Sequence, residues 1–303
     1  MWVLIDGCMY GYRTWHSLPK EIRIVENDSK QISDKHKNLF VYLFCQQLVT
    51  LKQELLARRN RSTKFIKFLI CWDGKMSSKF RKQEWQPYKE QRRNLPSRML
   101  IYNSPFVYMD YLRNKLTQVN ERYGLVFENA EADDLIAIIA RKYIKQDQQM
   151  QVVIVSRDTD MYQIVDERIR VYNPYTKEMI DGQGVYDKLG VSPDKVVEFK
   201  TLVGDSSDNY IGVRKVGPKT ALKIMEDPEQ VKKMEEDNPQ MEVFKRIATL
   251  PYHRLDKDKI LRALKDVNYD QISDWQKLVN SLGFKADAIE SCLLYTSPSP
   301  RDS

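Results

Sequence analysis

Carboxylates recur in this sequence where an apolar segment ends or a helical pattern begins. One group opens an apolar helical pattern and consists of Glu131, Asp133 and Asp134. A second group follows a β-branched run and consists of Asp158 and Asp160. Carboxylates this close repel one another unless a helix dipole, solvent or bound cations offset the repulsion. Taken alone, the first group is typical of an ordinary acidic helix N-terminus, and the alternative is a site where bound cations offset the repulsion.

Further carboxylates follow predicted strands. Residues 2–5 and 65–72 have the apolar character of buried strands, and Asp-Gly follows each of them, at Asp6 and Asp73. Between them, residues 33–59 show the apolar spacing of a long amphipathic helix. This alternation predicts an α/β fold with a central, mostly parallel sheet, whose carboxyl edge is where ligands gather.

Residues 151–155 form a third predicted strand, and it delivers Asp158 and Asp160 to the same edge of the sheet. If the backbone stays extended there, both carboxylates share one face and can contact one ion. Farther on, residues 169–172 and 177–180 predict a β-pair around Asn173-Pro174.

The alternation is interrupted from residue 75 to about residue 122 by a basic and aromatic segment. Its basic members include Lys79, Arg81, Lys89 and Arg92, and its aromatic members include Phe80, Trp85 and Tyr88. Cations mixed with rings suit a phosphate backbone and unstacked bases, which is how single strands are bound. The alternative is a solvated, charged helix.

Short helices and glycine turns follow residue 184. A helix is expected from residues 192–193 to residue 203, and Asp205 and Asp208 come directly after it. The next turn carries Gly212, Gly217, Pro218, Lys219 and Thr220. Glycines allow a tight hairpin, proline suits a first helical turn, and free backbone amides there can bind a phosphate. The alternative is a plain structural turn.

Composition narrows the class of protein. Of 303 residues, 49 are Lys or Arg and 42 are Asp or Glu, and this excess of seven favours a polyanionic partner. The four cysteines have no paired-ligand spacing, so we expect a reducing compartment and no zinc site. Without a signal-like segment or a run of about 18 apolar residues, a soluble, cytoplasmic protein is expected. Residues 293–303 lack periodicity and resemble a non-native tail.

Five motifs, taken in order, resemble the 5′ nuclease family of phage flap endonucleases and the 5′ nuclease domain of bacterial DNA polymerase I. They are Asp6-Gly7, Asp73-Gly74, Glu131-Ala132-Asp133-Asp134, Ser156-x-Asp158-x-Asp160 and Gly204-Asp205-x-x-Asp208-Asn209. The resemblance runs from residue 2 to about residue 225 and more weakly to about residue 290. One departure is that Asn209-Tyr210-Ile211-Gly212 lacks the proline usual in relatives.

The resemblance implies a fold and a division into domains. Residues 1–190 would form an α/β nuclease domain with a helical arch, about residues 75–122, over the active site. Residues 191–292 would form a helical domain that grips duplex DNA with a helix-three-turn-helix. The protein is expected to act as a monomer, and its free-standing, diverged chain favours a phage origin, which would place it in the host cytoplasm.

The resemblance also implies the site residues. Nine carboxylates would bind divalent metal: Asp6, Asp73, Glu131, Asp133, Asp134, Asp158, Asp160, Asp205 and Asp208. The metal is normally two Mg²⁺ ions; Mn²⁺ is expected to substitute, and K⁺ is a further candidate ion at the helix-three-turn-helix. Lys89 and Arg92 would act on the scissile phosphate or steer the flap. The expected DNA-binding residues are Arg13, Lys79, Arg81, Tyr88, Lys200, Gly212, Gly217, Lys219 and Thr220.

We expect the nine carboxylates to have different roles in metal binding. Glu131, Asp133, Asp158 and Asp160 would mainly hold a first ion, Asp6, Asp73 and Asp134 would lie around or behind it, and Asp205 and Asp208 would hold a second. On a helix, Glu131 and Asp134 share a face, whereas Asp133 points elsewhere. The three therefore cannot all play one role.

The predicted activity is two-metal hydrolysis of phosphodiesters in DNA with 5′ ends or 5′ flaps, including RNA primers, in replication and repair. One rival is a haloacid-dehalogenase-type phosphatase, because Asp158-x-Asp160 follows a strand. That motif needs its first Asp directly after the strand, whereas Ser156 and Arg157 intervene here. The non-enzymatic rival is a DNA-binding module, which would bind DNA without metal-dependent cleavage.

Overall fold

The computed structural model describes residues 1–23, 32–58, 66–92, 105–119, 124–264 and 278–284. The chain divides into two compact units, each built from separate stretches of sequence. The first consists of Met1–Tyr10, Phe65–Met99 and Gly124–Val267, and the second of Gly11–Lys64, Leu100–Tyr123 and Asn268–Ser303. The expected tail at 293–303 and the middle of the expected arch, residues 93–104, lie outside the described residues.

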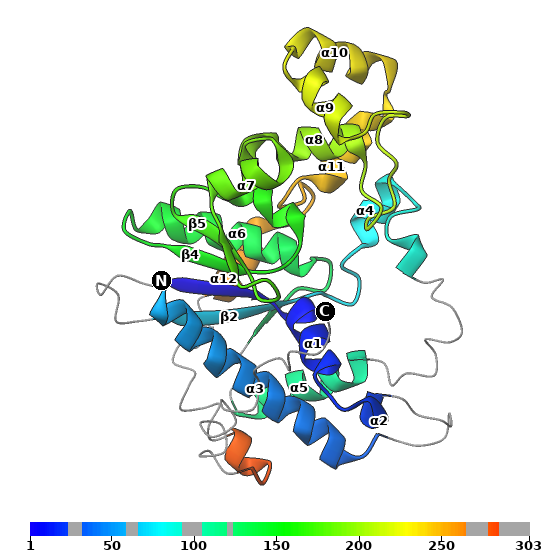
Figure 1. The fold of residues 1–303 in the computed structure, drawn as a ribbon. Helices are drawn as coiled ribbons and strands as arrows, with labels where there is room; N and C mark the ends of the chain where they lie inside the picture. Colours follow the sequence, from blue (N-terminus) through cyan, green and yellow to red (C-terminus); the bar gives the residue numbers. More distant parts are fainter. Residues whose placement is uncertain (24–31, 59–65, 93–104, 120–123, 265–277, 285–303) are drawn as a thin grey trace, which may run out of the picture. The chain divides into compact units, whose positions relative to one another are not determined.

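The first unit is organised around one sheet (Figure 1). Its strands are β1 (Trp2–Asp6), β2 (Lys67–Trp72), β3 (Gly124–Val126), β4 (Val152–Val155), β5 (Ile169–Asn173) and β6 (Glu178–Ile180). They lie in the order β3-β2-β1-β4-β5-β6, with every neighbouring pair parallel except β5 and β6. The predicted parallel sheet and the predicted β5–β6 pair are both confirmed.

Strand order reverses between β1 and β4. From β1 the chain adds β2 and then β3 on one side, and β4 begins the additions on the other side. Asp6, at the end of β1, pairs with Cys71, and Ile5 pairs with Val155 of β4. In open α/β sheets this reversal leaves a crevice beyond the carboxyl ends of the strands. The acids that follow β1, β2 and β4 therefore meet at one edge.

Helix α6 (Ala132–Gln146) covers part of this sheet and contacts β1, β2 and β4. Its apolar residues Leu135, Ile136 and Ile139 are fully buried. Burying one such side chain contributes about 1.5–3 kcal/mol, so this face fixes how the helix sits. The N-terminus of α6, with its acids, is consequently held at a defined point beside the sheet edge.

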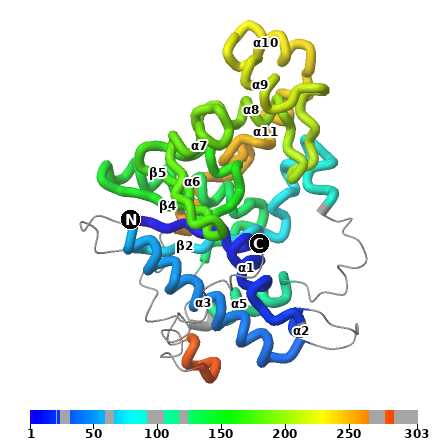
Figure 2. The backbone as a smooth tube through the Cα atoms, viewed as in Figure 1, coloured from blue at the N-terminus to red at the C-terminus, as the bar shows by residue number. Residues whose placement is uncertain are grey.

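The remaining helices of the first unit follow the strands or form its C-terminal part. They are α4 (Lys79–Glu84), α7 (Gly182–Leu189), α8 (Val196–Val203), α9 (Pro218–Met225), α10 (Pro228–Asp237), α11 (Gln240–Ala248) and α12 (Lys257–Ala263), with 3₁₀ turns η1 (Glu90–Arg92), η3 (Thr159–Ile164) and η4 (Pro193–Lys195). Helix α8 packs on α9 and α11, and α9 and α10 lie together (Figure 2). The short helices predicted after residue 184 are confirmed.

The second unit is helical in its described part. It holds α2 (Lys20–Arg23), α3 (Asp34–Ala57), α5 (Pro105–Val119) and most of α1 (Gly7–His16), which continues directly from β1. Ser33 caps α3 by accepting a hydrogen bond from the backbone N–H of His36. Helix α3 packs on α5, with the rings of Phe40 and Tyr108 5.4 Å apart. Among the described helices, we find none with the length and apolar character needed to cross a membrane.

Candidate nuclease site

The predicted acids come together at the carboxyl edge of the first unit's sheet. Asp6 ends β1, and its Oδ1 accepts a hydrogen bond from the backbone N–H of Met9 at 2.9 Å. Asp73 follows β2, and its Oδ1 accepts from the N–H of Ala132, the first residue of α6, at 2.7 Å. The carboxylate that follows β2 thus binds the N-terminus of α6, the helix that carries Asp133 and Asp134.

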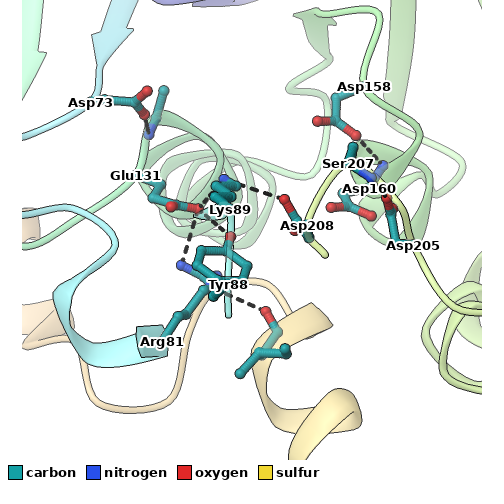
Figure 3. Close-up of polar contacts among 12 residues, drawn as sticks. Asp73, Arg81, Tyr88, Lys89, Glu131, Asp158, Asp160, Asp205, Ser207 and Asp208 are labelled. Carbon is teal, nitrogen blue, oxygen red and sulfur yellow. Dashed lines mark hydrogen bonds and ion pairs between the residues drawn. The ribbon is translucent and has the colours of Figure 1, made fainter. Parts of the chain in front are cut away.

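Two groups of acids can be followed in Figure 3. The helix cluster contains Glu131 and Asp73, with Arg81, Tyr88 and Lys89 around Glu131. The turn cluster contains Asp158, Asp160, Asp205 and Asp208, which come from the end of β4 and from the turn after α8. Asp208 lies between the two clusters, because Lys89 approaches both Glu131 and Asp208.

Lys89 occupies a backbone conformation that lysine rarely adopts. Its φ is +54°, in the left-handed region, which a non-glycine residue keeps only where its surroundings enforce it. Its Nζ donates to Glu131 Oε2 at 2.9 Å and lies 3.6 Å from Asp208 Oδ1. The Tyr88 hydroxyl donates to the same Glu131 oxygen at 2.9 Å. Burial opposes ionisation of Glu131, but Lys89 and Arg81 outweigh it and lower its pKa to about 2.

Arg81 and Asp134 form a buried bidentate pair. Arg81 Nη1 and Nη2 donate to the two Asp134 oxygens at 2.7 and 2.8 Å, and Nε donates to the carbonyl of Ile247 at 2.9 Å. Asp134 also accepts from the backbone N–H of Tyr252 at 2.8 Å and of Glu131 at 3.4 Å. Bidentate pairs of this kind are strong and geometrically specific.

This pair differs from the expectation for both residues. Asp134 was expected near a metal and Arg81 on DNA, yet each uses its polar atoms on the other and on the backbone, and both are fully buried. Glu131 is the extended N-cap of α6 and not part of the helix, but its side chain lies on the same side as Asp134, since Arg81 Nη1 also lies 3.4 Å from Glu131 Oε2. Asp134 therefore has the structural role that this group suggests when taken alone, that of an acid in the first turn of a helix.

Lys200 bridges two members of the turn cluster. Its Nζ contacts Asp160 Oδ1 directly and donates to Asp205 Oδ2 at 2.9 Å. Burial opposes the charge on Lys200, but Asp160 and Asp205 outweigh it and raise the pKa of the ammonium. Lys200 was expected to approach DNA; only 8% of the residue is exposed, and its charge is directed inward.

The expected shared face of Asp158 and Asp160 is not observed. Asp158 Oδ1 accepts from the backbone N–H of Asp160 at 2.9 Å and so caps η3, which begins at Thr159. The backbone therefore turns between the two acids instead of staying extended, as an Asp cap favours. Burial, followed by repulsion from Asp158 and Asp208, raises the pKa of Asp160 to about 7 despite its contact with Lys200.

Among the described residues, three acids have no ion-pair partner within 4 Å: Asp6, Asp133 and Asp158 of the turn cluster. Burial and then repulsion from Asp73 raise the pKa of Asp6 to about 7. Burial and then repulsion from Asp158 and Asp6 raise the pKa of Asp133. Carboxylates that repel one another this strongly are relieved by a cation, and hard oxygen donors suit Mg²⁺ or Mn²⁺.

The carboxylate oxygens are the ligand type that a divalent ion prefers, but the described side chains are not arranged around a common point. Within the described part of the chain, no group of three or more His, Cys, Asp or Glu side chains is placed so that it could hold a metal ion as it stands. Some carboxylates instead hold side-chain cations: Glu131 contacts Lys89, and Asp160 contacts Lys200. Metal binding would therefore require side chains to rotate, and these ammonium groups would be displaced.

The other predicted DNA-binding residues are dispersed. Lys79 opens α4 and is exposed. Gly217 precedes α9, and Lys219 and Thr220 are exposed in its first turn. Arg13 lies in the second unit, where its Nη1 donates to Gln47 Oε1 at 2.7 Å. The backbone of Arg92 ends η1, and its side chain lies outside the described residues.

Two expected contacts have structural explanations instead. Tyr88 is fully buried and directs its hydroxyl at Glu131. Gly212 has a φ of +63°, and a Cβ there would lie 2.3 Å from the backbone nitrogen of Gly204. The turn that lacks the family's proline is closed instead by reciprocal backbone hydrogen bonds between Asp205 and Tyr210, at 2.8 and 3.1 Å.

Sequence reasoning missed residues that act through the backbone. Gln91 and Trp85 donate to carbonyls of residues 206, 207 and 209, beside Asp205 and Asp208. Trp85 was visible only as one ring in the basic and aromatic segment, and no pattern singled out Gln91. Ser207 also contributes, since its N–H and hydroxyl donate to Asp205 Oδ1 at 2.7 and 2.6 Å.

The chain resembles known proteins across both halves. Residues 1–190 match the 5′-3′ exonuclease N-terminal resolvase-like domain, and residues 191–279 match the 5′-3′ exonuclease C-terminal SAM fold. A 5′-3′ exonuclease of Buchnera aphidicola is 28% identical over 76% of this chain and 71% of its own length. DNA polymerase I of Pseudomonas aeruginosa is 30% identical over 74% of this chain, which spans only 22% of that protein.

The fold is also shared with a solved structure. The T5 D15 protein, co-crystallised with metal ions, superposes with a TM-score of 0.62 over 93% of this chain and 97% of its own, at 16% identity. At this identity the likeness shows the fold alone: a mostly parallel sheet flanked by helices. The two matched domains, which cover most of the sequence, show that the chain belongs to the 5′-3′ exonuclease family of nucleases.

Proposed function

We propose that this chain hydrolyses phosphodiester bonds in DNA that carries 5′ ends or 5′ flaps, with divalent metal held by its acidic clusters. The observation that carries the proposal is the meeting of acids from β1, β2, β4, α6 and the turn after α8 at one sheet edge. Family membership supports the same activity. RNA primers on DNA are a further proposed substrate, and the proposed working form is a monomer in the cytoplasm.

The acids would divide into two binding groups. Asp6, Asp133 and Asp158, with Asp73 and Glu131 beside them, would hold one ion; Asp205 and Asp208, with Asp160, would hold another. Bound Mg²⁺, for which Mn²⁺ would substitute, would lower the pKa of a water nucleophile and stabilise the leaving oxygen. Asp134 has a positioning role in this proposal, because Arg81 and the backbone occupy its oxygens.

Lys89 would act on the scissile phosphate. Its ammonium lies against Glu131 and near Asp208. If these two carboxylates were engaged by a metal, the Lys89 ammonium would be available to contact a phosphate oxygen. Arg92 would assist from the next turn of the same segment. The strained backbone of Lys89 supports this role, since strain of this kind collects at functional sites.

Duplex DNA would be bound at a distance from the chemistry. The start of α9 offers backbone amides, Pro218 at the first position, and the exposed Lys219 and Thr220, a combination that suits a phosphate. K⁺ at this turn remains a proposal. Lys79 and Arg13 would add contacts to the sugar-phosphate backbone, which supplies much of the affinity for DNA.

A labelled 5′-flap duplex tests the proposal. The protein should release 5′ fragments with Mg²⁺ and none with EDTA, and the Asp158→Asn variant should bind the duplex without cutting it. Binding by the wild type without cleavage at any Mg²⁺ concentration would instead favour a DNA-binding module. Equal cleavage by Asp158→Asn would remove Asp158 from the metal site.

A further inference from the structure

The acidic turn, residues 205–209, is held by a segment more than a hundred residues earlier in the chain. This clamp segment, residues 85–91, runs between α4 and the end of the described stretch before residue 93. Both belong to the first unit. The acidic turn carries Asp205 and Asp208, so contacts that fix its backbone also fix the positions from which these two side chains extend.

The clamp segment binds the turn almost entirely through backbone carbonyls. Gln91 Nε2 donates to the carbonyls of Ser206 and Ser207, at 2.6 and 2.9 Å. Trp85 Nε1 donates to the carbonyl of Asn209 at 2.9 Å, and the backbone N–H of Lys89 donates to the carbonyl of Asp208 at 3.2 Å. Four consecutive carbonyls, those of residues 206 to 209, are therefore held by three clamp residues.

The turn reciprocates at one point. Asn209 Nδ2 donates to the carbonyl of Pro87 at 2.8 Å. Asn209 also has a φ of +61°, a left-handed conformation that asparagine tolerates better than most residues. The side chain of Asn209 thus points back at the clamp segment while its own carbonyl receives the Trp85 indole.

Aromatic side chains of the clamp segment and of the residue after the acidic turn pack against α11. Trp85 meets Phe244 of α11 edge to face, with ring centroids 5.1 Å apart, and Tyr210 stacks on the same ring at 5.1 Å. Tyr88 and Tyr210 belong to one buried cluster with Phe244. This packing orients the Trp85 ring with its N–H toward the carbonyl of Asn209.

We propose that Gln91 and Trp85 are positioning residues that hold the acidic turn so that Asp205 and Asp208 can share a cation. This rests on the proposed function of the turn cluster. Asp208 repels Asp158 and Asp160, so without the clamp the part of the turn that carries Asp208 would move away from them, although Lys200 still joins Asp205 to Asp160. Gln91 touches no carboxylate of the cluster in the described contacts and would act only through the carbonyls that it holds.

Calorimetric Mg²⁺ titration of the whole chain, without DNA, tests the proposal. Gln91→Met keeps the length of the side chain and removes both donors; we expect about tenfold weaker binding at one of two sites and no change at the other. Because Gln91 is exposed and loses only two hydrogen bonds, the melting temperature in EDTA should fall by no more than a few degrees. Trp85→Phe keeps the ring against Phe244 but removes the indole donor, and should weaken the same site.

Gln86→Met is the matched control. Gln86 is exposed in the same segment, and its amide contacts Glu90 and not the described residues of the turn, so Mg²⁺ binding should not change. Hydrogen exchange gives a second readout: the Tyr210 amide, which donates to Asp205, should lose protection in Gln91→Met but not in Gln86→Met. Unchanged Mg²⁺ binding in Gln91→Met, or equal weakening of both sites with a lowered melting temperature, would overturn the proposal. Failure of the wild type to cleave a flap would instead contradict the proposed function.

Discussion

Replacing Lys200 by Met tests how the turn cluster is balanced without metal. In the structure the Lys200 ammonium neutralises Asp160 and Asp205, and all three side chains are about nine-tenths buried. Methionine keeps the volume and removes the charge. We expect the EDTA-treated variant to be less stable than the wild type, and expect it to bind Mg²⁺ more tightly, because no ammonium competes for the two carboxylates.

The size of the effect follows from the burial of the pair. Removing one partner of a buried ion pair costs about 3–5 kcal/mol, since the other charge is left without compensation. Proton uptake by Asp160, whose pKa is already about 7, limits the loss to the lower end. A loss of about 3 kcal/mol corresponds to a melting temperature roughly 6–12 °C lower for a chain of this size.

Thermal melting with EDTA measures the loss of stability, and melting with saturating Mg²⁺ measures the tighter binding of the ion. The Mg²⁺-induced increase in melting temperature should be larger for Lys200→Met than for the wild type. Lys219→Met is the control, because Lys219 is exposed on α9 and should affect DNA affinity alone. If Lys200→Met weakens DNA binding and leaves both melting temperatures unchanged, Lys200 contacts DNA and the reasoning is refuted.

Three further perturbations follow from the site. In EDTA, the pKa of Asp6 is about 7 in place of 3.8. Its contribution to the free energy of unfolding, up to about 4 kcal/mol, is therefore present below pH 4 and lost as pH rises through 7. The melting temperature should fall over that range, and Mg²⁺ should restore it at pH 8. Arg81→Met should cost about 3–5 kcal/mol in urea unfolding, because Asp134 is left buried without its partner; weakened DNA binding at unchanged stability would be inconsistent with this. Lys89→Ala should lower single-turnover cleavage far more than duplex affinity, and equal losses of both would place Lys89 on the duplex instead.

The strand ends and their acids could be predicted from sequence because their signals are local. Residues 2–5 and 151–155 are short apolar runs, and the structure has strands at Trp2–Asp6 and Val152–Val155. The long helix predicted at 33–59 is observed at Asp34–Ala57. Once the strands are parallel, the edge at which Asp6 and Asp73 meet follows from topology alone.

The partners of those acids could not be predicted, because they come from distant parts of the chain. Arg81 and Asp134 are 53 residues apart, and Tyr252 is 118 residues beyond Asp134. A basic residue in a basic segment gives no local sign of whether it faces DNA or a buried carboxylate. The turn between Asp158 and Asp160 was missed for a related reason: the side chain of Asp158 competes with extended backbone by capping η3.

The most direct test of two cation sites at this sheet edge is the anomalous scattering of Mn²⁺ in crystals of the protein. We predict two peaks, one beside Asp133 and Asp158 and one beside Asp205 and Asp208, with the Lys200 ammonium moved away from Asp160. A single peak elsewhere, or none with Mn²⁺ at concentrations that support cleavage, would contradict the account.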